Sequence, residues 1–199
     1  MKSILAFLLI LFNLNLYSQT DVKLVISENT INKIFDAIGP ISGEGEYKIV
    51  QTKKFTWLLQ GTHIDLIQDS ALFITQAEVK THLGTYYDEI RGKVSVTYNE
   101  KTNLISIQII DAQFEVAIRI GKMRMVLRRI QLADYFKTPF QFEGPGRMNE
   151  DISFQMPNGD MKKISVKPQH FKMRIIDNSI IVTSDLTFSN DSTKTLTSK

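Results

Sequence analysis

The chain has 199 residues, of which 24 are basic and 21 acidic, and a net charge of +3. A charge balance this close to neutral gives no support for a nucleic-acid partner, which usually requires a strongly basic surface. The chain contains no cysteine, which excludes disulfides, thiolate metal sites and the acylated cysteine of a bacterial lipoprotein.

Residues 1–18 are predicted to form a secretory signal peptide. Lys2 supplies a positive charge, residues 4–16 are almost entirely apolar, and the chain turns polar from Tyr17. We expect cleavage between Ser18 and Gln19, which would make this an exported, soluble protein of the periplasm or the extracellular space. The alternative, an uncleaved anchor, is disfavoured because the apolar run is shorter than the roughly 20 residues that span a bilayer.

A short strand and an amphipathic helix are predicted next. Apolar residues alternate over 22–26, as in a strand, and Ser27 is a suitable N-cap because its hydroxyl accepts a hydrogen bond from a free backbone N–H. Apolar side chains then recur at helical spacing until Gly39 and Pro40 end the helix: Ile31, Ile34, Phe35 and Ile38. A helix this short is not stable alone, so its apolar stripe must be buried by another element.

Long antiparallel strands are predicted for most of the remaining chain. Residues 41–46 contain Gly43 and Gly45 and are predicted to form a loop without phosphate-binding character. From residue 47 to residue 188, apolar and polar residues alternate over long stretches. Within a strand, the apolar residues occupy either odd-numbered or even-numbered positions. They change from odd to even at Gly61 and again near Asp111, and this change of parity predicts a bulge or sharp twist at each place. Long strands with such bulges should form a strongly curved sheet.

The predicted fold class is therefore α+β. A long, strongly curved antiparallel sheet should wrap around one short N-terminal amphipathic helix, and a second short helix is predicted near residues 130–136. Asn158 and Gly159 predict a tight hairpin turn between two late strands. No linker divides the chain, so we expect a single domain over residues 19–188 and a polar, disordered tail over residues 189–199.

No motif in the chain predicts catalysis. His63, His82 and His170 are far apart and lack metal-binding spacing, so we interpret them as surface residues and expect no metal or other cofactor. Scattered carboxylates leave a two-carboxylate glycosidase open, but no spacing points to one. We therefore expect a protein that is not an enzyme.

Five basic side chains are interleaved with apolar residues in one segment: Arg119, Lys122, Arg124, Arg128 and Arg129. They could contact anionic headgroups at a membrane surface. The alternative, which we favour, is a solvated strand face of the kind common in charged strands. Met123 and Met125 could line an adaptable apolar pocket, although their usual role is core packing.

The order of these segments resembles a single-repeat bacterial relative of the tubular lipid-binding (TULIP-like) superfamily. The resemblance is carried by ISENTINKIFDAIG (residues 26–39), HIDLIQDSALFITQAEVK (63–80), GKVSVTYNEKTNLISIQIIDAQFEV (92–116) and IQLADYFKTPFQFEG (130–144). It implies a helix wrapped in a long curved sheet, often with an apolar ligand between the two. The superfamily has no shared catalytic residues.

Two functions are consistent with these observations. The leading hypothesis is binding of a lipid or other apolar small molecule between the helix and the concave sheet, in a pocket lined by Ile31, Ile34, Phe35, Ile38, Phe73, Val94, Val96, Phe114 and Val116. The alternative is a structural or protein-interaction module of the cell envelope, whose interior is filled by its own side chains.

Overall fold

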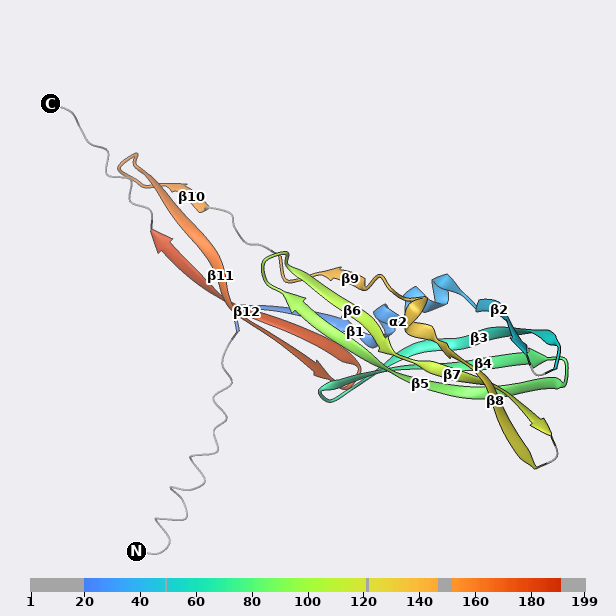
Figure 1. The fold of residues 1–199 in the computed structure, drawn as a ribbon. Helices are drawn as coiled ribbons and strands as arrows, with labels where there is room; N and C mark the ends of the chain where they lie inside the picture. Colours follow the sequence, from blue (N-terminus) through green and yellow to red (C-terminus); the bar gives the residue numbers. More distant parts are fainter. Residues whose placement is uncertain (1–19, 49, 121, 147–151, 191–199) are drawn as a thin grey trace, which may run out of the picture.

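The computed structural model describes residues 20–48, 50–120, 122–146 and 152–190. The predicted signal peptide lies outside the described residues, as does the predicted tail beyond residue 190. The described chain forms twelve strands, one α-helix and one 3-10 turn. Figure 1 shows an elongated molecule, in which a wide β-structure with the helix continues into a narrow arm of strands.

The largest sheet has six antiparallel strands in the order β2-β3-β4-β5-β6-β9. These strands are β2 (Ile41–Lys48), β3 (Thr52–Ile67), β4 (Ser70–Thr81), β5 (Gly84–Asn99), β6 (Leu104–Asp111) and β9 (Phe140–Glu143). The sheet is curled into a half-barrel (Figure 1). The prediction of a curved antiparallel sheet is confirmed at this level.

Both predicted changes of parity coincide with irregular pairing. At Gly61, which has a φ of 61°, the register between β3 and β4 shifts between Gln60 and His63. Near Asp111, the register between β5 and β6 shifts and leaves Ile110 without a partner in β5. Each bulge bends the strand that contains it, so the two together contribute to the curl of the sheet.

The chain leaves the large sheet after Asp111 and forms a separate hairpin. Strands β7 (Gln113–Ile120) and β8 (Met123–Gln131) pair only with each other in the described chain. The predicted second helix near 130–136 is shorter than expected: Ile130 and Gln131 end β8, and only the 3-10 turn η1 (Leu132–Asp134) follows. The η1 turn is anchored because the Leu132 N–H donates to the Ala112 carbonyl at 2.7 Å and the Leu132 side chain is buried.

A second sheet of four antiparallel strands has the order β1-β12-β11-β10. Its strands are β1 (Val22–Ser27), β10 (Ile152–Gln155), β11 (Met161–Ile176) and β12 (Ser179–Asn190). The predicted Asn158-Gly159 turn joins β10 to β11, with Gly159 at a φ of 90°. The last strand extends to Asn190, two residues beyond the predicted end at Phe188, because β11 still pairs with it there.

The helix α2 (Glu28–Ile38) follows β1 and has the predicted ends. The Ser27 hydroxyl accepts a hydrogen bond from the Thr30 N–H at 3.2 Å, and Gly39, at a φ of 72°, donates its N–H to the Phe35 carbonyl at 3.0 Å. Positive φ is costly for residues with a Cβ, which explains why a glycine ends this helix.

The prediction of a loop over residues 41–46 was wrong, because these residues begin strand β2. Gly43 pairs with Trp57 and Gly45 pairs with Phe55 across the β2–β3 ladder. Each aromatic ring lies over its glycine so closely that a Cβ on either glycine would collide with the ring. An aromatic side chain thus fills the space that the glycine leaves, and the strand remains packed despite its two glycines.

The β2–β3 ladder stops at the pair of Ile41 and Leu59, and beyond it side chains from α2 form hydrogen bonds with the edge of β3. The Asn32 amide forms two hydrogen bonds with the backbone of Ile64, accepting from its N–H at 2.7 Å and donating to its carbonyl at 2.9 Å. Glu28 accepts from the Leu66 N–H at 2.7 Å. These bonds orient the helix against the sheet, with its buried side chains Ile31 and Phe35 facing the core.

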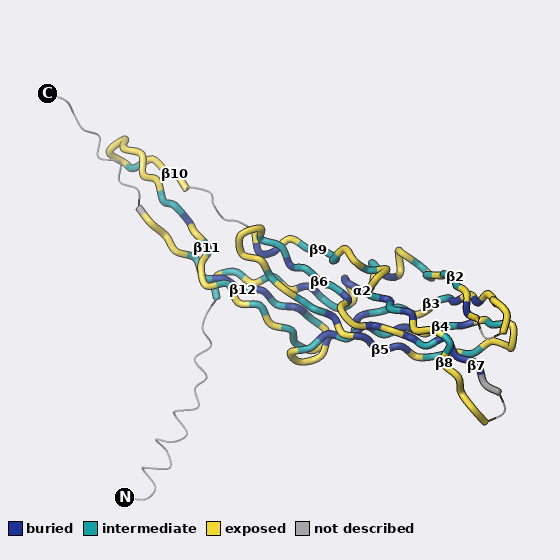
Figure 2. The backbone as a smooth tube through the Cα atoms, viewed as in Figure 1, coloured by how far each residue is buried: buried dark blue, intermediate teal, exposed yellow. Residues whose placement is uncertain are grey.

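The β11–β12 turn connects the two larger sheets through hydrogen bonds to the end of β3. Asn178 donates its N–H to the Leu66 carbonyl at 2.9 Å and accepts from the Glu28 N–H at 2.9 Å. Asp177 accepts from the Gln68 N–H at 2.9 Å. Burial is therefore concentrated where the helix and sheets meet, whereas the far ends of β10 and β11 are mostly exposed (Figure 2).

Candidate functional site

Most of the predicted ligand-lining residues lie in one hydrophobic core. Six of the nine belong to it as buried side chains: Ile31, Phe35, Phe73, Val94, Phe114 and Val116. Val96 packs against this core from a partly buried position, and Ile34 is half-buried. Ile38, the last residue of the helical stripe, is 47% exposed and lies at the edge of the core.

Aromatic rings surround the centre of the helical stripe. The ring of Phe35 makes edge contacts with Phe140, Phe73 and Phe136, at centroid distances of 5.3, 6.2 and 6.3 Å. Phe73 and Phe136 also contact each other at 5.7 Å. Side chains of the protein itself therefore occupy the space around Phe35, where the sequence predicted the middle of a ligand pocket.

An open pocket of about 490 Å³ lies at the C-terminal end of α2. Its apolar lining is formed by Ile38, Ile41, Tyr135, Phe136 and Phe140, and its polar lining by Asp134, Lys137 and Thr138. Phe136 and Phe140 are also ring neighbours of Phe35, so the pocket borders directly on the aromatic cluster. We call it the helix-end pocket.

The walls of the helix-end pocket come from two segments far apart in the sequence: the end of α2 with the start of β2, and the segment after η1. The helix ends at Gly39, so that Ile41 enters β2 and Ile38 remains at the surface. On the other side, Tyr135 follows η1 and makes an edge contact with Trp57 at 5.4 Å. The apolar lining therefore rests on buried neighbours, while part of it remains accessible, with Tyr135 58% exposed.

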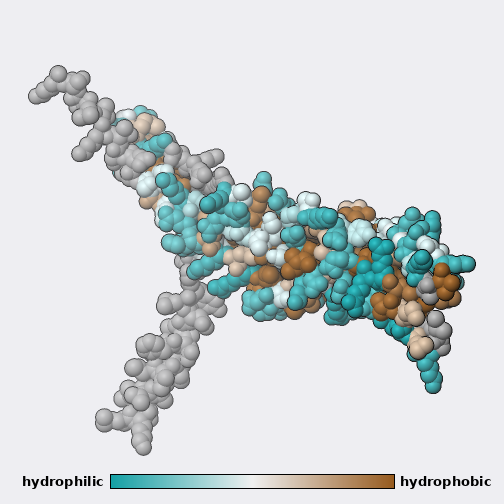
Figure 3. Space-filling view, viewed as in Figure 1, coloured by the Kyte–Doolittle hydropathy of each residue, from teal (hydrophilic) through white to brown (hydrophobic). Residues whose placement is uncertain are grey.

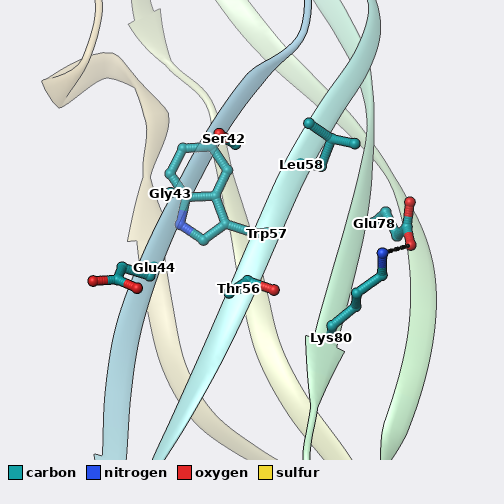
Figure 4. A pocket seen from close by; sticks show the side chains of 8 residues that line it. All are labelled: Ser42, Gly43, Glu44, Thr56, Trp57, Leu58, Glu78 and Lys80. Carbon is teal, nitrogen blue, oxygen red and sulfur yellow. Dashed lines mark ion pairs between the residues drawn. The ribbon is translucent and has the colours of Figure 1, made fainter.

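A second pocket, of about 370 Å³, lies over β2, β3 and β4 (Figure 4). The ring of Trp57 lines it, and the buried indole Nε1 has no hydrogen-bond partner among the described residues. Beside it, Lys80 Nζ lies 2.9 Å from Glu78 Oε1, and this hydrogen bond raises the pKa of Lys80. Because the two charged groups satisfy each other, we assign no ligand to this pocket.

The predicted basic cluster lies on the β7–β8 hairpin, where one carboxylate holds two of its cations. Glu115 pairs with Arg124 at 2.6 Å and with Arg129 at 3.0 Å, and these two hydrogen bonds lower the pKa of Glu115. Lys122 and Arg128 are exposed, and the side chain of Arg119 lies outside the described part of the structure. The cluster therefore contains both neutralised and free cations.

A tyrosine hydroxyl joins this hairpin to the large sheet. The register between β7 and β8 shifts between Val116 and Ala117, so that Leu127 of β8 has no partner in β7. The Tyr86 hydroxyl accepts from the Ala117 N–H and donates to the Glu115 carbonyl, both at 2.8 Å. Partial burial raises the pKa of Tyr86, so the neutral hydroxyl that makes both bonds is favoured.

The three histidines lie in separate surroundings. His63 Nδ1 lies 2.8 Å from the Gly61 carbonyl, His82 contacts the Tyr47 hydroxyl, and His170 lies 3.5 Å from Asp185. In the part of the chain that the structure describes, no three histidine or acidic side chains are grouped as metal ligands. Over the same residues, no helix has the length and apolar character needed to cross a membrane.

The helix-end pocket differs from the predicted one in most of its lining. Only Ile38 is common to both, because Ile41 was assigned to a loop and Tyr135 and Phe136 to a short helix. The spacing of Tyr135, Phe136 and Phe140 did not indicate that they would meet the end of α2, since that contact is set by the anchoring of η1. Comparisons of the chain with family profiles, with curated proteins and with solved structures gave no match.

Proposed function

We propose that this is an exported protein that binds a lipid or another apolar small molecule at the helix-end pocket. The observation that carries the proposal is the accessible apolar lining of Ile38, Ile41, Tyr135, Phe136 and Phe140 around about 490 Å³. This volume falls in the range of small-molecule sites, which are typically apolar with a few polar groups. Export rests on the predicted signal peptide over residues 1–18.

The helix-end pocket shifts the proposed binding position from the middle of the helical stripe to its end. An apolar chain would lie against Ile38 and Phe140, and its polar end would reach Lys137 or Thr138 at the rim. Deeper entry would require rotation of Phe136 or Phe140 away from Phe35. The proposed fold relationship is the TULIP-like one, which is supported by the curled sheet and by the burial of Ile31 and Phe35 against it.

The second candidate function is a structural or protein-interaction module of the cell envelope. It is favoured by the aromatic cluster around Phe35, because a core filled by its own side chains leaves no interior room at that point. The two candidates differ in one measurable property, which is the presence of a bound apolar molecule.

The deciding experiment is native mass spectrometry of the protein purified from its own cell envelope, combined with titration of a fluorescent fatty acid. We expect a co-purifying apolar molecule and saturable binding of the probe. Ile38→Asp should abolish probe binding, because it places a charge in the apolar lining. Ile67→Asp is the matched control, since Ile67 is 42% exposed and lies outside the pocket lining. Absence of binding by the wild-type protein, or equal loss in both variants, would favour the structural module.

A further inference from the structure

Three turns from distant parts of the sequence meet at one end of the molecule. They join β2 to β3, β4 to β5 and β7 to β8, and Figure 1 shows all three at the right-hand end. The first two are linked by a hydrogen bond between the Tyr47 hydroxyl and His82 Nδ1, whose rings lie 5.8 Å apart. We call this region the three-turn end.

The β7–β8 hairpin is adjacent to the second of these turns. A pocket of about 460 Å³ between them is lined by Leu83 and Tyr87 on one side and by Ile118 and Arg124 on the other. The Tyr86 hydroxyl holds the base of the hairpin against β5. The relative positions of the turns are therefore maintained by specific contacts.

Each turn exposes an apolar side chain at its tip. Val50 is 86% exposed, Leu83 is 54% exposed and Met123 is 70% exposed. Single exposed apolar residues are common on protein surfaces, but three tips at one end of a molecule are a local concentration. Figure 3 shows apolar surface gathered at this end, beside hydrophilic surface.

Free lysines surround these tips. Lys48, Lys53, Lys54 and Lys122 are exposed and form no ion pair with any described residue. The carboxylates of this end are fewer and partly engaged: Glu78 pairs with Lys80, Glu115 pairs with two arginines, and Glu44, Glu46 and Asp88 remain, with Glu46 opposite Lys54 in the β2–β3 ladder. The three-turn end thus combines apolar tips with an excess of unpaired positive charge.

We propose that the three-turn end docks on an anionic lipid bilayer. Val50, Leu83 and Met123 enter the headgroup layer, and the surrounding lysines lie against lipid phosphates. Apolar contact and electrostatic attraction to anionic lipids act together in interfacial binding of this kind. The basic residues of β8 alone do not define this surface, since Arg124 and Arg129 are paired with Glu115.

A bilayer fits this surface better than a folded protein partner does. The apolar tips belong to separate turns, so a protein would need a matching hollow for each tip. A fluid headgroup layer accommodates separate side chains without a preformed shape. The opposite end also exposes Met161 and Phe188, but Phe188 lies close in sequence to residues outside the described part, and no docking surface is assigned there.

The first test measures sedimentation of the protein with phosphatidylglycerol vesicles and with phosphatidylcholine vesicles. We expect binding to the anionic vesicles that weakens with added salt. Replacing Lys53, Lys54 and Lys122 by glutamine should weaken it on the order of a hundredfold, at about fivefold for each lysine. The control is the double variant Met161→Ser/Lys162→Gln at the other end, which should bind like the wild type. No binding by the wild type, or an equal loss in the control, overturns the proposal.

The second test asks whether the tips enter the bilayer. The chain has no cysteine, so Val50→Cys and Met161→Cys can each be labelled at one position with a polarity-sensitive dye. On anionic vesicles, we expect the dye at position 50 to report an apolar environment and the dye at position 161 to remain in water. The variant Val50→Ser/Leu83→Ser/Met123→Ser should bind about tenfold more weakly. An unchanged dye signal at position 50 overturns insertion of the tips. Because none of these positions lines the helix-end pocket, fatty-acid binding should be unaffected.

Discussion

The two halves of strand β3 are covered at their free edge in different ways. In the first half, β2 supplies a regular ladder from Thr52 to Leu59. In the second half, no strand of the described residues continues the ladder, and side chains of α2 bond to the backbone of Ile64 and Leu66 instead. The comparison shows that a helix with two correctly spaced polar residues can replace a strand at a sheet edge.

The two solutions depend on different properties of the sequence. The strand solution requires small residues, because Gly43 and Gly45 must lie beneath aromatic rings. The helix solution requires polar side chains of defined length, because Glu28 and Asn32 must reach backbone groups of β3. Buried or half-buried backbone groups need partners in either case, since an unpaired one is costly.

The largest expected effect is in the strand-covered half. In Gly43→Val the new side chain would collide with the ring of Trp57, so β2 must move away or the ring must leave the core. We expect a loss of about 3 kcal/mol in the free energy of unfolding, measured by urea denaturation followed by circular dichroism. Gly146→Val is the control, because a Cβ there meets no neighbour within 4 Å. Equal stability of both variants would contradict this account of β2.

In the helix-covered half, Asn32→Ala removes both bonds to Ile64. We expect a loss of about 2 kcal/mol in the free energy of unfolding, because a backbone N–H and a carbonyl lose their partners. Asn32→Asp keeps an acceptor for the Ile64 N–H and should lose less. Asn29→Ala, on the exposed part of the same helix, controls for a change in helix propensity. If Asn32→Ala were no less stable than Asn29→Ala, the edge would not depend on the helix.

Strand β7 extends the comparison to a third case, in which the hydroxyl of Tyr86 forms hydrogen bonds with its backbone. Tyr86→Phe leaves the Ala117 N–H and the Glu115 carbonyl without this partner. We expect a loss of about 1 kcal/mol, accompanied by faster amide hydrogen exchange at Ala117 than in the wild type. Tyr87→Phe is the control, since Tyr87 is 68% exposed. Unchanged exchange at Ala117 would show that the hydroxyl does not protect this part of β7.

The smallest expected effect concerns the surface ion pairs of the same hairpin. Hydrogen bonds from Arg124, with the larger effect, and from Arg129 lower the pKa of Glu115 below its ordinary value of 4.5. The two ion pairs therefore stabilise the folded state at neutral pH. This contribution should be lost as the pH falls below 4.5 through the lowered pKa. We expect Glu115→Gln to show a weaker fall in stability with acid than the wild type, measured by thermal unfolding at several pH values. Parallel pH profiles would contradict this role of Glu115.

Local features of the fold could be predicted from the sequence because neighbouring residues determine them. Ser27 and Gly39 were correctly identified at the helix ends, and Gly61 at a bulge, since each acts on its own stretch of backbone. The curved sheet followed from strand length and parity. These predictions required no knowledge of which strands pair.

Features that depend on distant contacts could not be predicted in the same way. The glycines of β2 were assigned to a loop because the rings of Phe55 and Trp57 that cover them come from another strand. The bonds from Asn32 to Ile64 connect residues 32 positions apart, and no pattern in the helix indicates them. The helix-end pocket was missed for the same reason, since Tyr135 and Phe140 reach it only through the fold.

The position of Trp57 has a practical consequence for spectroscopy. It is the single tryptophan of the chain, it is 2% exposed, and its ring makes edge contacts with Phe114 and Tyr135. These contacts bring together β3, β7 and the segment after η1, so the indole emission reports on one junction of three elements. Its intensity and wavelength can therefore follow assembly of this junction in refolding kinetics without an added label.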